Sequence, residues 1–550
     1  MDFFVKALKD EGFQGECESD EATLAHYSHD ASMFELKPRL VVRPKNTEDL
    51  VILVKAVEKN QAKVPNLSIT ARSGGTDMSG GAIGQSVVID FTRYFHNIGK
   101  VSKTAANVQP GVLYREFEKA TLAQGVLLPS FPASRELATV GGMVANNAGG
   151  EKSLRWGKTE DYVSQLEVVL ADGQATSLKA LSRTELAAKQ KLKSFEGDIY
   201  RQMFKLLDDN YEVIKAAKPK VSKNSTGYNL WDVWDRQTGT FDLTKLFVGS
   251  QGTLGLISDI DFKLVPASAH SGVLAVFMKN IDDLGEIINA VLEHRPESFE
   301  AFDNYTINFS IRFFPFFRKT LGWWGLIKLG LALLPDVLIF LKGIPKMILL
   351  VEFTGETPEE VARKVHALRS SLEHFKLEAM EEDSTEARAW KFRIIRRESF
   401  NLLRQKVHDK HTAPFIDDLV VPPAHLPEFL PKLRAIIKKY DLLATIAGHM
   451  GDGNFHVIPL MRIEDPHERA KLEPAMREVN ELVLGFGGSL SGEHNDGLIR
   501  GPWLEQMYGK SVADLFRQTK KIFDPDNIFN PRKKTDANWD FSMSVLRKKF

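Results

Sequence analysis

The chain has 550 residues, 43% of them hydrophobic, and its 72 lysines and arginines balance its 72 aspartates and glutamates. This composition supports large buried cores in roughly three or four domains, and it excludes a disordered chain and general nucleic-acid binding, which needs a concentrated positive field. The only cysteine, Cys17, excludes an internal disulfide, a cysteine-type zinc site and an iron–sulfur cluster. Electron chemistry must therefore use an organic cofactor, or a metal held by histidine and carboxylate.

The first 40 residues form an amino-terminal segment that we expect to be partly helical. They contain no basic stretch followed by an apolar core, so we predict no signal peptide and a cytoplasmic protein. From Val41 a strand reaches Pro44, and Thr47 is predicted to cap an amphipathic helix. Further predicted strands or strand–helix pairs lie at 86–92, 105–125 and 163–173, the last ending in an Asp-Gly turn.

A second domain is expected over residues 269–424. The segments 269–302 and 346–375 both read as strand, turn and helix, which favours an α+β unit on an antiparallel sheet. Residues 425–550 are predicted to be largely helical and to carry two short polar clusters.

An apolar but basic insertion, residues 312–347, interrupts this second domain. It is rich in phenylalanine, contains Trp323 and Trp324, and has several spaced basic residues against one acid, Asp336. Its longest uncharged run, Thr320–Ile327, has eight residues, far below the about 20 that span a bilayer. Aromatic residues among lysines and arginines suit a segment lying on a membrane surface. A buried insertion or a contact with a partner subunit is the alternative.

Three glycine-rich segments lie in the first domain: RSGGTDMSGG (72–81), PSFPASRELATVGGMVANNAGG (129–150) and VGSQGTLGLIS (248–258). Glycine lets consecutive amides converge on a phosphate, although the first segment taken alone also fits an ordinary tight loop. It is neither a G-x-G-x-x-G fingerprint nor a P-loop. The second and third segments favour backbone lying flat against a large rigid ligand.

These three segments resemble the FAD-binding domain of the family that includes vanillyl-alcohol oxidase and the FAD-linked D-2-hydroxyacid dehydrogenases. The resemblance implies that the amides of residues 73–77 hold the FAD pyrophosphate. Thr76 stands where covalent members carry a flavin-linked histidine, so the FAD should be non-covalent, and Gln251 replaces the usual glutamate. The cofactor contacts implied are Arg72, Ser73, Gly74, Gly75, Thr76, Asp77, Ser79, Pro132, Ser134, Thr139, Gly142, Asn147, Gly149, Ile257 and Asn530.

Two histidine clusters follow, GHMGDGNFH (448–456) and SLSGEHNDG (489–497). Imidazole and carboxylate in an open site suit Zn²⁺ or another first-row divalent ion, with zinc the first expectation. Hydrogen-bonded structural histidines are the alternative, and the second Glu-His pair favours the metal.

The clusters resemble the carboxyl-terminal signatures of FAD-linked D-2-hydroxyacid dehydrogenases, such as D-lactate, glycolate and D-2-hydroxyglutarate dehydrogenases. The resemblance implies metal ligands at His449, His456 and Glu493, a catalytic base at His494, and a substrate contact at Asn454. An arginine should bind the substrate carboxylate, and we favour Arg397, with Arg393 beside it; a solvated basic helix face is the alternative. Ile416 stands where D-2-hydroxyglutarate dehydrogenases carry a lysine for the second carboxylate.

We therefore expect an α+β fold with three parts: a vanillyl-alcohol-oxidase (PCMH-type) FAD-binding domain over 41–268, a ferredoxin-like antiparallel cap domain and a helical carboxyl-terminal segment. The expected function is oxidation of a D-2-hydroxy acid to the 2-keto acid, with electrons passed to a quinone or a separate carrier protein. The alternatives are a flavin-bearing relay subunit of an iron–sulfur complex, and an alcohol or aldonolactone oxidase that uses O₂. The insertion 312–347 would place the protein peripherally on the inner face of a membrane.

Overall fold

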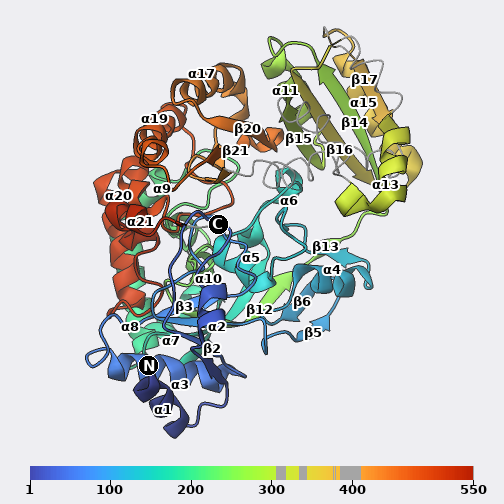
Figure 1. Ribbon diagram of the computed structural model, residues 1–550. Coiled ribbons are helices and arrows are strands. Elements are labelled where there is room, and N and C mark those ends of the chain that lie inside the picture. Colours follow the sequence, from blue (N-terminus) through green and yellow to red (C-terminus); the bar gives the residue numbers. More distant parts are fainter. Residues whose placement is uncertain (305–317, 334–342, 376, 378, 384–409, 549–550) are drawn as a thin grey trace.

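The structure, a computed structural model, describes residues 1–304, 318–333, 343–375, 377, 379–383 and 410–548. Three large β-sheets and one two-stranded ribbon organise the described part of the chain (Figure 1). Two of the large sheets belong to the amino-terminal half, drawn from blue to green, and the third lies above them in this view.

The first sheet has four strands in the order β1-β2-β4-β3. Its elements are β1 (Glu16–Glu18), β2 (Leu40–Arg43), β3 (Ile69–Arg72) and β4 (Val87–Asp90), with helices α1 (Asp2–Asp10), α2 (Glu21–His26) and α3 (Thr47–Asn60) between or before them. Helix α3 is the helix expected after Pro44. The predicted cap at Thr47 is wrong: Asn46 is the N-cap, and its side chain accepts the Asp49 amide at 2.9 Å.

The second sheet has seven strands in the order β10-β11-β9-β8-β12-β6-β5. They are β10 (Trp234–Asp235), β11 (Thr240–Asp242), β9 (Ala175–Leu181), β8 (Val163–Val169), β12 (Leu256–Lys263), β6 (Ala105–Val108) and β5 (Ile98–Val101). Strand β12 alternates buried and half-buried side chains, as expected of an antiparallel strand with one face on a core. The associated helices are α4 (Tyr114–Leu122), α5 (Val140–Asn146), α6 (Ser153–Trp156), α7 (Arg183–Gln190), α8 (Phe195–Asp209), α9 (Tyr211–Ala216) and α10 (Thr244–Phe247), and β7 (Val126–Leu127) pairs with β13 (Val265–Pro266).

The third sheet is antiparallel and has eight strands, in the order β17-β14-β16-β15-β20-β21-β18 with β19 also paired to β21. They are β14 (His270–Met278), β15 (Ser298–Asp303), β16 (Met347–Gly355), β17 (Ala379–Asp383), β18 (His411–Thr412), β19 (Leu419–Val420), β20 (Leu443–His449) and β21 (Asn454–Met461). One core joins the sheet to helices α11 (Leu284–Glu293), α15 (Pro358–Leu372) and α17 (Leu426–Lys439). The sheet continues past residue 424, so the first histidine cluster extends the sheet of the predicted cap.

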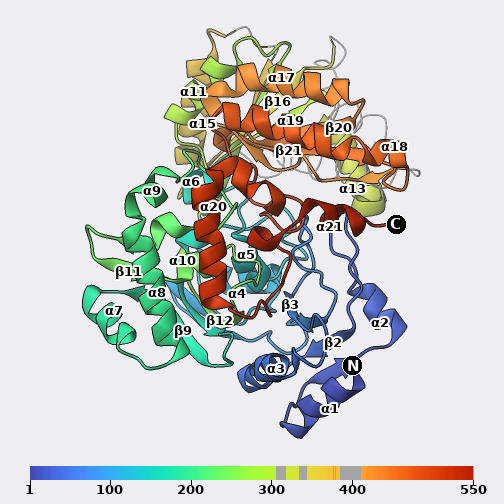
Figure 2. The ribbon, with the colours of Figure 1, turned by 90° about the vertical axis from the view of Figure 1, so that its left-hand side faces the viewer.

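The carboxyl-terminal helices are α18 (Pro466–Arg469), α19 (Leu472–Gly485), α20 (Leu504–Phe523) and α21 (Trp539–Ser544). Helix α20 returns to the amino-terminal half, where Phe516 joins the core of the seven-stranded sheet (Figure 2). The chain end thereby ties the third sheet to the glycine-rich domain.

Within the segment 312–347 the structure describes helix α13 (Arg318–Leu333), which is broken at Gly322, and residues 343–347. Gly322 has a φ of 68°, a conformation that side chains other than glycine rarely adopt. Among the described residues we find no helix with the length and hydropathy that a membrane crossing requires.

Candidate active site

The first histidine cluster forms a tight turn between two paired strands. Strand β20 ends at His449, and β21 begins at Asn454, its cross-strand partner. The glycines between and before them are sterically required: a Cβ at Gly453 would lie 1.8 Å from the Val421 carbonyl oxygen, and one at Gly448 2.2 Å from that of Asn454. The turn brings the imidazoles of His449 and His456 to a centroid distance of 5.4 Å.

The second cluster is a loop held by one buried carboxylate. The amides of Glu493 and His494 donate to Asp418 Oδ2 at 2.8 and 2.7 Å, and the Ser491 hydroxyl donates to the same oxygen. These bonds fix the loop beside strand β21. Glu493 and His494 therefore face the two histidines of the first cluster.

His449, His456 and Glu493 offer donor atoms that all lie within 4.8 Å of one another. His449 Nε2 and Glu493 Oε1 are 3.3 Å apart. Ligands about 2.1 Å from a tetrahedral Zn²⁺ are separated by about 3.4 Å, so this spacing fits a shared ion. Two imidazoles and a carboxylate are also a donor set that zinc prefers, and the residues present fit the metal.

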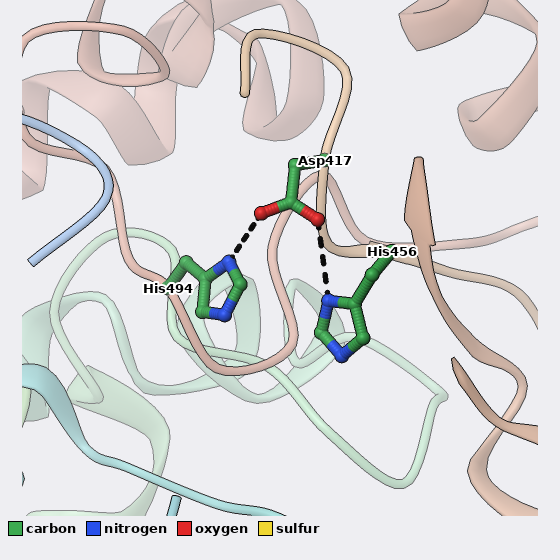
Figure 3. Close-up of side chains that lie close together, drawn as sticks. All are labelled: Asp417, His456 and His494. Atoms are coloured by element: carbon green, nitrogen blue, oxygen red, sulfur yellow. Dashed lines mark hydrogen bonds and ion pairs between the residues drawn. The ribbon is translucent and has the colours of Figure 1, made fainter. Parts of the chain in front are cut away.

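Asp417 bridges two histidines on the other side of this group (Figure 3). His494 Nδ1 lies 2.6 Å from Asp417 Oδ2, and His456 Nδ1 lies 3.2 Å from Asp417 Oδ1. Asp417, His456 and His494 also satisfy the spacing of a metal-binding trio. The paired hydrogen bonds account for their geometry and leave Nε2 of each ring available.

Burial and charge act in opposite directions on the pKa values of these groups. Burial disfavours the His494 imidazolium, but Asp417 and Asp418 outweigh it and raise the pKa of His494 to about 9. Burial raises the pKa of Asp417, yet the neighbouring His494 and His456 hold that pKa well below its usual range. Burial lowers the pKa of His449, but the charge of the neighbouring Glu300 outweighs this effect and raises that pKa to about 9.

A buried lysine, Lys223, contributes positive charge to the cluster. Its Nζ lies 2.5 Å from Glu493 Oε1 and 3.1 Å from Asp452 Oδ2. Burial raises the pKa of Glu493, but Lys223 and His449 hold that pKa well below the usual value. Glu493 is therefore an anion, as a metal ligand must be.

The glycine-rich loop after β3 offers backbone donors. The amides of Gly74, Gly75, Thr76 and Asp77 donate no hydrogen bond to any residue that the structure describes. The loop packs closely on the second segment, since a Cβ at Gly74 would lie 2.5 Å from the Leu137 carbonyl oxygen. Consecutive unpaired amides on a half-buried loop fit the pyrophosphate of a dinucleotide such as FAD.

The other residues predicted to line the flavin come from several segments of the chain. Thr139 caps α5, accepting the Gly142 amide at 3.2 Å, and its hydroxyl bonds Ser73. Asn147 ends α5 with a φ of 52°. Asn530 donates to the carbonyl oxygens of Gly81 and Gln251, both at 2.8 Å. Arg72 is the last residue of β3 and Ser79 lies in the loop after it. Pro132 and Ser134 precede α5, Gly149 follows it, and Ile257 lies in β12.

The remaining predictions divide between those that the structure places in the cluster and those that it does not describe. Asn454 is fully buried, and its Nδ2 donates to Asp418 Oδ1 at 3.0 Å. Its Oδ1 has no hydrogen-bond partner among the described residues, so an acceptor is available to a ligand. Arg393 and Arg397 lie outside the described residues.

Three contributors were missed by sequence reasoning. Asp417 could have been noticed because adjacent acids interrupt the apolar run PFIDDLVV, and Glu300 because it sits in the apolar strand SFEAFD. Lys223, in VSKNSTG, gives no local signal. All three are 5% exposed or less.

Two family models match the chain. Residues 38–179 match the description "FAD binding domain", and residues 267–534 match "FAD linked oxidases, C-terminal domain". The first range contains two of the glycine-rich segments, and the second contains both histidine clusters.

Curated relatives are 24–27% identical to this chain. A D-2-hydroxyglutarate dehydrogenase of Pseudomonas putida aligns over 96% of this chain. The chain spans only 51% of that protein, and the same share of the D-2-hydroxyglutarate dehydrogenases of two other bacteria. The glycolate oxidase subunit GlcD of Bacillus subtilis aligns over 92% of this chain and 91% of its own length. The solved structure of p-cresol methylhydroxylase with substrate bound is 15% identical, with a TM-score of 0.67 over 98% of this chain and 97% of that one. This likeness confirms the predicted α+β fold class.

Proposed function

The chain belongs to the FAD-linked oxidase family, as its glycine and histidine motifs predicted, and from this premise we propose that it oxidises a D-2-hydroxy acid to the 2-keto acid. One observation carries the proposal: the histidine–carboxylate cluster lies directly against the glycine-rich FAD segment. A Cβ at Gly149 would lie 3.2 Å from Glu493 Oε1, and Asn146 Nδ2 donates to the Glu493 carbonyl at 3.1 Å. The two relatives are named for hydroxyglutarate and glycolate. Both compounds are 2-hydroxy acids, which supports this substrate class.

In this proposal each residue of the cluster has one task. In its neutral form His494, held through Nδ1 by Asp417, accepts the substrate hydroxyl proton at Nε2. Asn454 Oδ1 contacts the substrate, and Arg397 with Arg393 binds its carboxylate.

Two bound groups complete the site. Residues 73–77 and 139–149 would hold FAD without a covalent bond, and the flavin would supply the acceptor for the hydride of the substrate. His449, His456 and Glu493 would hold a divalent ion such as Zn²⁺, which would supply Lewis acidity for the oxidation of the alcohol.

The test is anaerobic bleaching of the bound flavin. A D-2-hydroxy acid should reduce the FAD at least about 100-fold faster than its L enantiomer, because the wrong enantiomer leaves buried polar groups unpaired. The control is the matching carboxylic acid without a 2-hydroxyl group. If no D-2-hydroxy acid bleaches the flavin but a reduced carrier protein does, the chain is a relay subunit, and the proposal fails. Peroxide formation with an alcohol substrate would favour the O₂-using oxidase.

We further propose that electrons leave the flavin for a quinone or a carrier protein at a membrane surface that helix α13 contacts. Trp324 is 85% exposed, and Ile327 and Leu331 follow it on one helix face at 48% and 62%. Lys328 is exposed on the same helix. Five more basic residues and one acid occur in residues 312–347, namely Arg312, Arg318, Lys319, Lys342, Lys346 and Asp336. Exposed tryptophan beside positive charge is typical of contact with anionic lipid.

Vesicle sedimentation tests this surface. The chain should pellet with vesicles rich in anionic phosphatidylglycerol, and replacing Trp323 and Trp324 with alanine should weaken the partitioning about 10-fold or more, because each indole buries a large apolar area. The control is Phe3→Ala, which removes another exposed aromatic, on α1. Equal partitioning of the tryptophan variant, or no binding by the unchanged chain, would contradict the membrane proposal.

A further inference from the structure

His449 and His456 are each held by a buried carboxylate on the ring nitrogen that faces away from the donor cluster. His449 Nδ1 lies 2.6 Å from Glu300 Oε1, and His456 Nδ1 lies 3.2 Å from Asp417 Oδ1. A carboxylate accepts a hydrogen bond only from a protonated nitrogen, so this contact fixes the proton on Nδ1. When the imidazole is neutral, Nε2 then carries the lone pair that a metal needs.

Strand register puts Glu300 where it meets His449. The two residues are direct partners in the antiparallel pair of β15 and β20, followed by Ala301 opposite Gly448. A slip of one residue would turn Glu300 to the other face of the sheet. Glu300 is 5% exposed and His449 is 3% exposed, so the contact is buried.

The strand that carries Glu300 is itself anchored on the glycine-rich domain. Glu297, three residues earlier, accepts the Trp156 indole N–H at 2.9 Å. Lys152 and Arg155, from the same helical turn, lie 3.3 and 3.1 Å from its carboxylate. Strand β15 therefore holds the His449 ring at a fixed place relative to the segment that binds the flavin.

We propose that Glu300 is a positioning residue for the metal centre. Through its hydrogen bond to Nδ1, Glu300 directs Nε2 of His449 toward the ion and makes His449 a stronger ligand. The proposal rests on the proposed function, which supplies the metal. Glu300 acts through His449, and its role is distinct from that of Glu297, which fixes the strand.

The matched pair Glu300→Gln and Glu297→Gln separates the two roles, because both are buried glutamates and Glu297 directly precedes the strand that carries Glu300. Metal-depleted, FAD-loaded protein is titrated with Zn²⁺ in competition with a fluorescent chelator. Glu300→Gln keeps the shape but removes the charge and should weaken Zn²⁺ binding by 10- to 100-fold. Glu297→Gln should leave Zn²⁺ affinity within about threefold of the unchanged chain. The flavin spectrum reports whether each variant is folded.

The outcomes distinguish the inference from its premise. If the unchanged chain holds no Zn²⁺, the metal in the proposed function is wrong, and the role of Glu300 fails with it. If the unchanged chain binds Zn²⁺ and Glu300→Gln binds it equally well, only the role of Glu300 is overturned. An equal loss in both variants would also overturn it, since the effect would then belong to the strand. Glu300→Ser, whose smaller side chain leaves room for a water molecule, repeats the test if the glutamine variant does not fold.

Discussion

Replacing His494 with alanine should slow substrate-driven flavin reduction by about 10²- to 10⁴-fold, the usual contribution of a positioned general base. The ring is 2.6 Å from Asp417 through Nδ1, so Nε2 is the atom that the substitution removes from the reaction. FAD should stay bound, because the backbone amides proposed to hold it lie on other loops. The measurement is the anaerobic bleaching rate with the best D-2-hydroxy acid, together with the flavin content of the purified variant.

His467→Ala is a suitable control because His467 is exposed on α18 and lies outside the cluster. It should bleach at the unchanged rate. Unchanged bleaching by His494→Ala with FAD still bound would remove His494 from the catalytic assignment.

Asp417→Asn should have an effect of similar size, about 10²- to 10⁴-fold on flavin reduction, although Asp417 does not contact the proposed substrate position. The asparagine amide has the same shape, but it can offer an N–H where the carboxylate accepts a hydrogen bond. The His494 and His456 rings would then lose the bond that keeps their protons on Nδ1. Because the defect lies in proton acceptance, kcat should fall much more than KM rises.

Asp259→Asn controls for loss of a carboxylate. Asp259 lies on β12, outside the histidine cluster; it is half-buried, and burial raises its pKa to about 6. This variant should be as active as the unchanged chain. A rate for Asp417→Asn within threefold of the control would show that neither histidine depends on Asp417.

Local chemistry made much of the fold predictable. A helix such as α3 follows from apolar residues at helical spacing, and the strands around it follow from short apolar runs between turn residues. Only its cap was misplaced by one residue, because Asn46 and Thr47 are both good caps and tertiary packing selects between them. The insertion of β20 and β21 into the cap sheet was not predicted, since strand pairing between distant segments leaves no local pattern.

The sequence by itself determined the parts of this protein that depend on backbone shape and on short motifs. Glycines at 74, 448 and 453 are required because any Cβ would meet a carbonyl oxygen, and such positions mark the FAD segments and the histidine turn. The single cysteine likewise restricted the redox chemistry to a bound organic cofactor or a metal on histidine and carboxylate.

Only the tertiary structure decided which groups control the reactive side chains. Glu300 and Asp417 lie 149 and 77 residues from the histidines that they hold most closely, and Lys223 lies 270 residues from Glu493. Contacts of this kind depend on sheet order and register, which are set by the packing of the whole chain. The motifs supply the histidines, and folding supplies the buried charges that orient them.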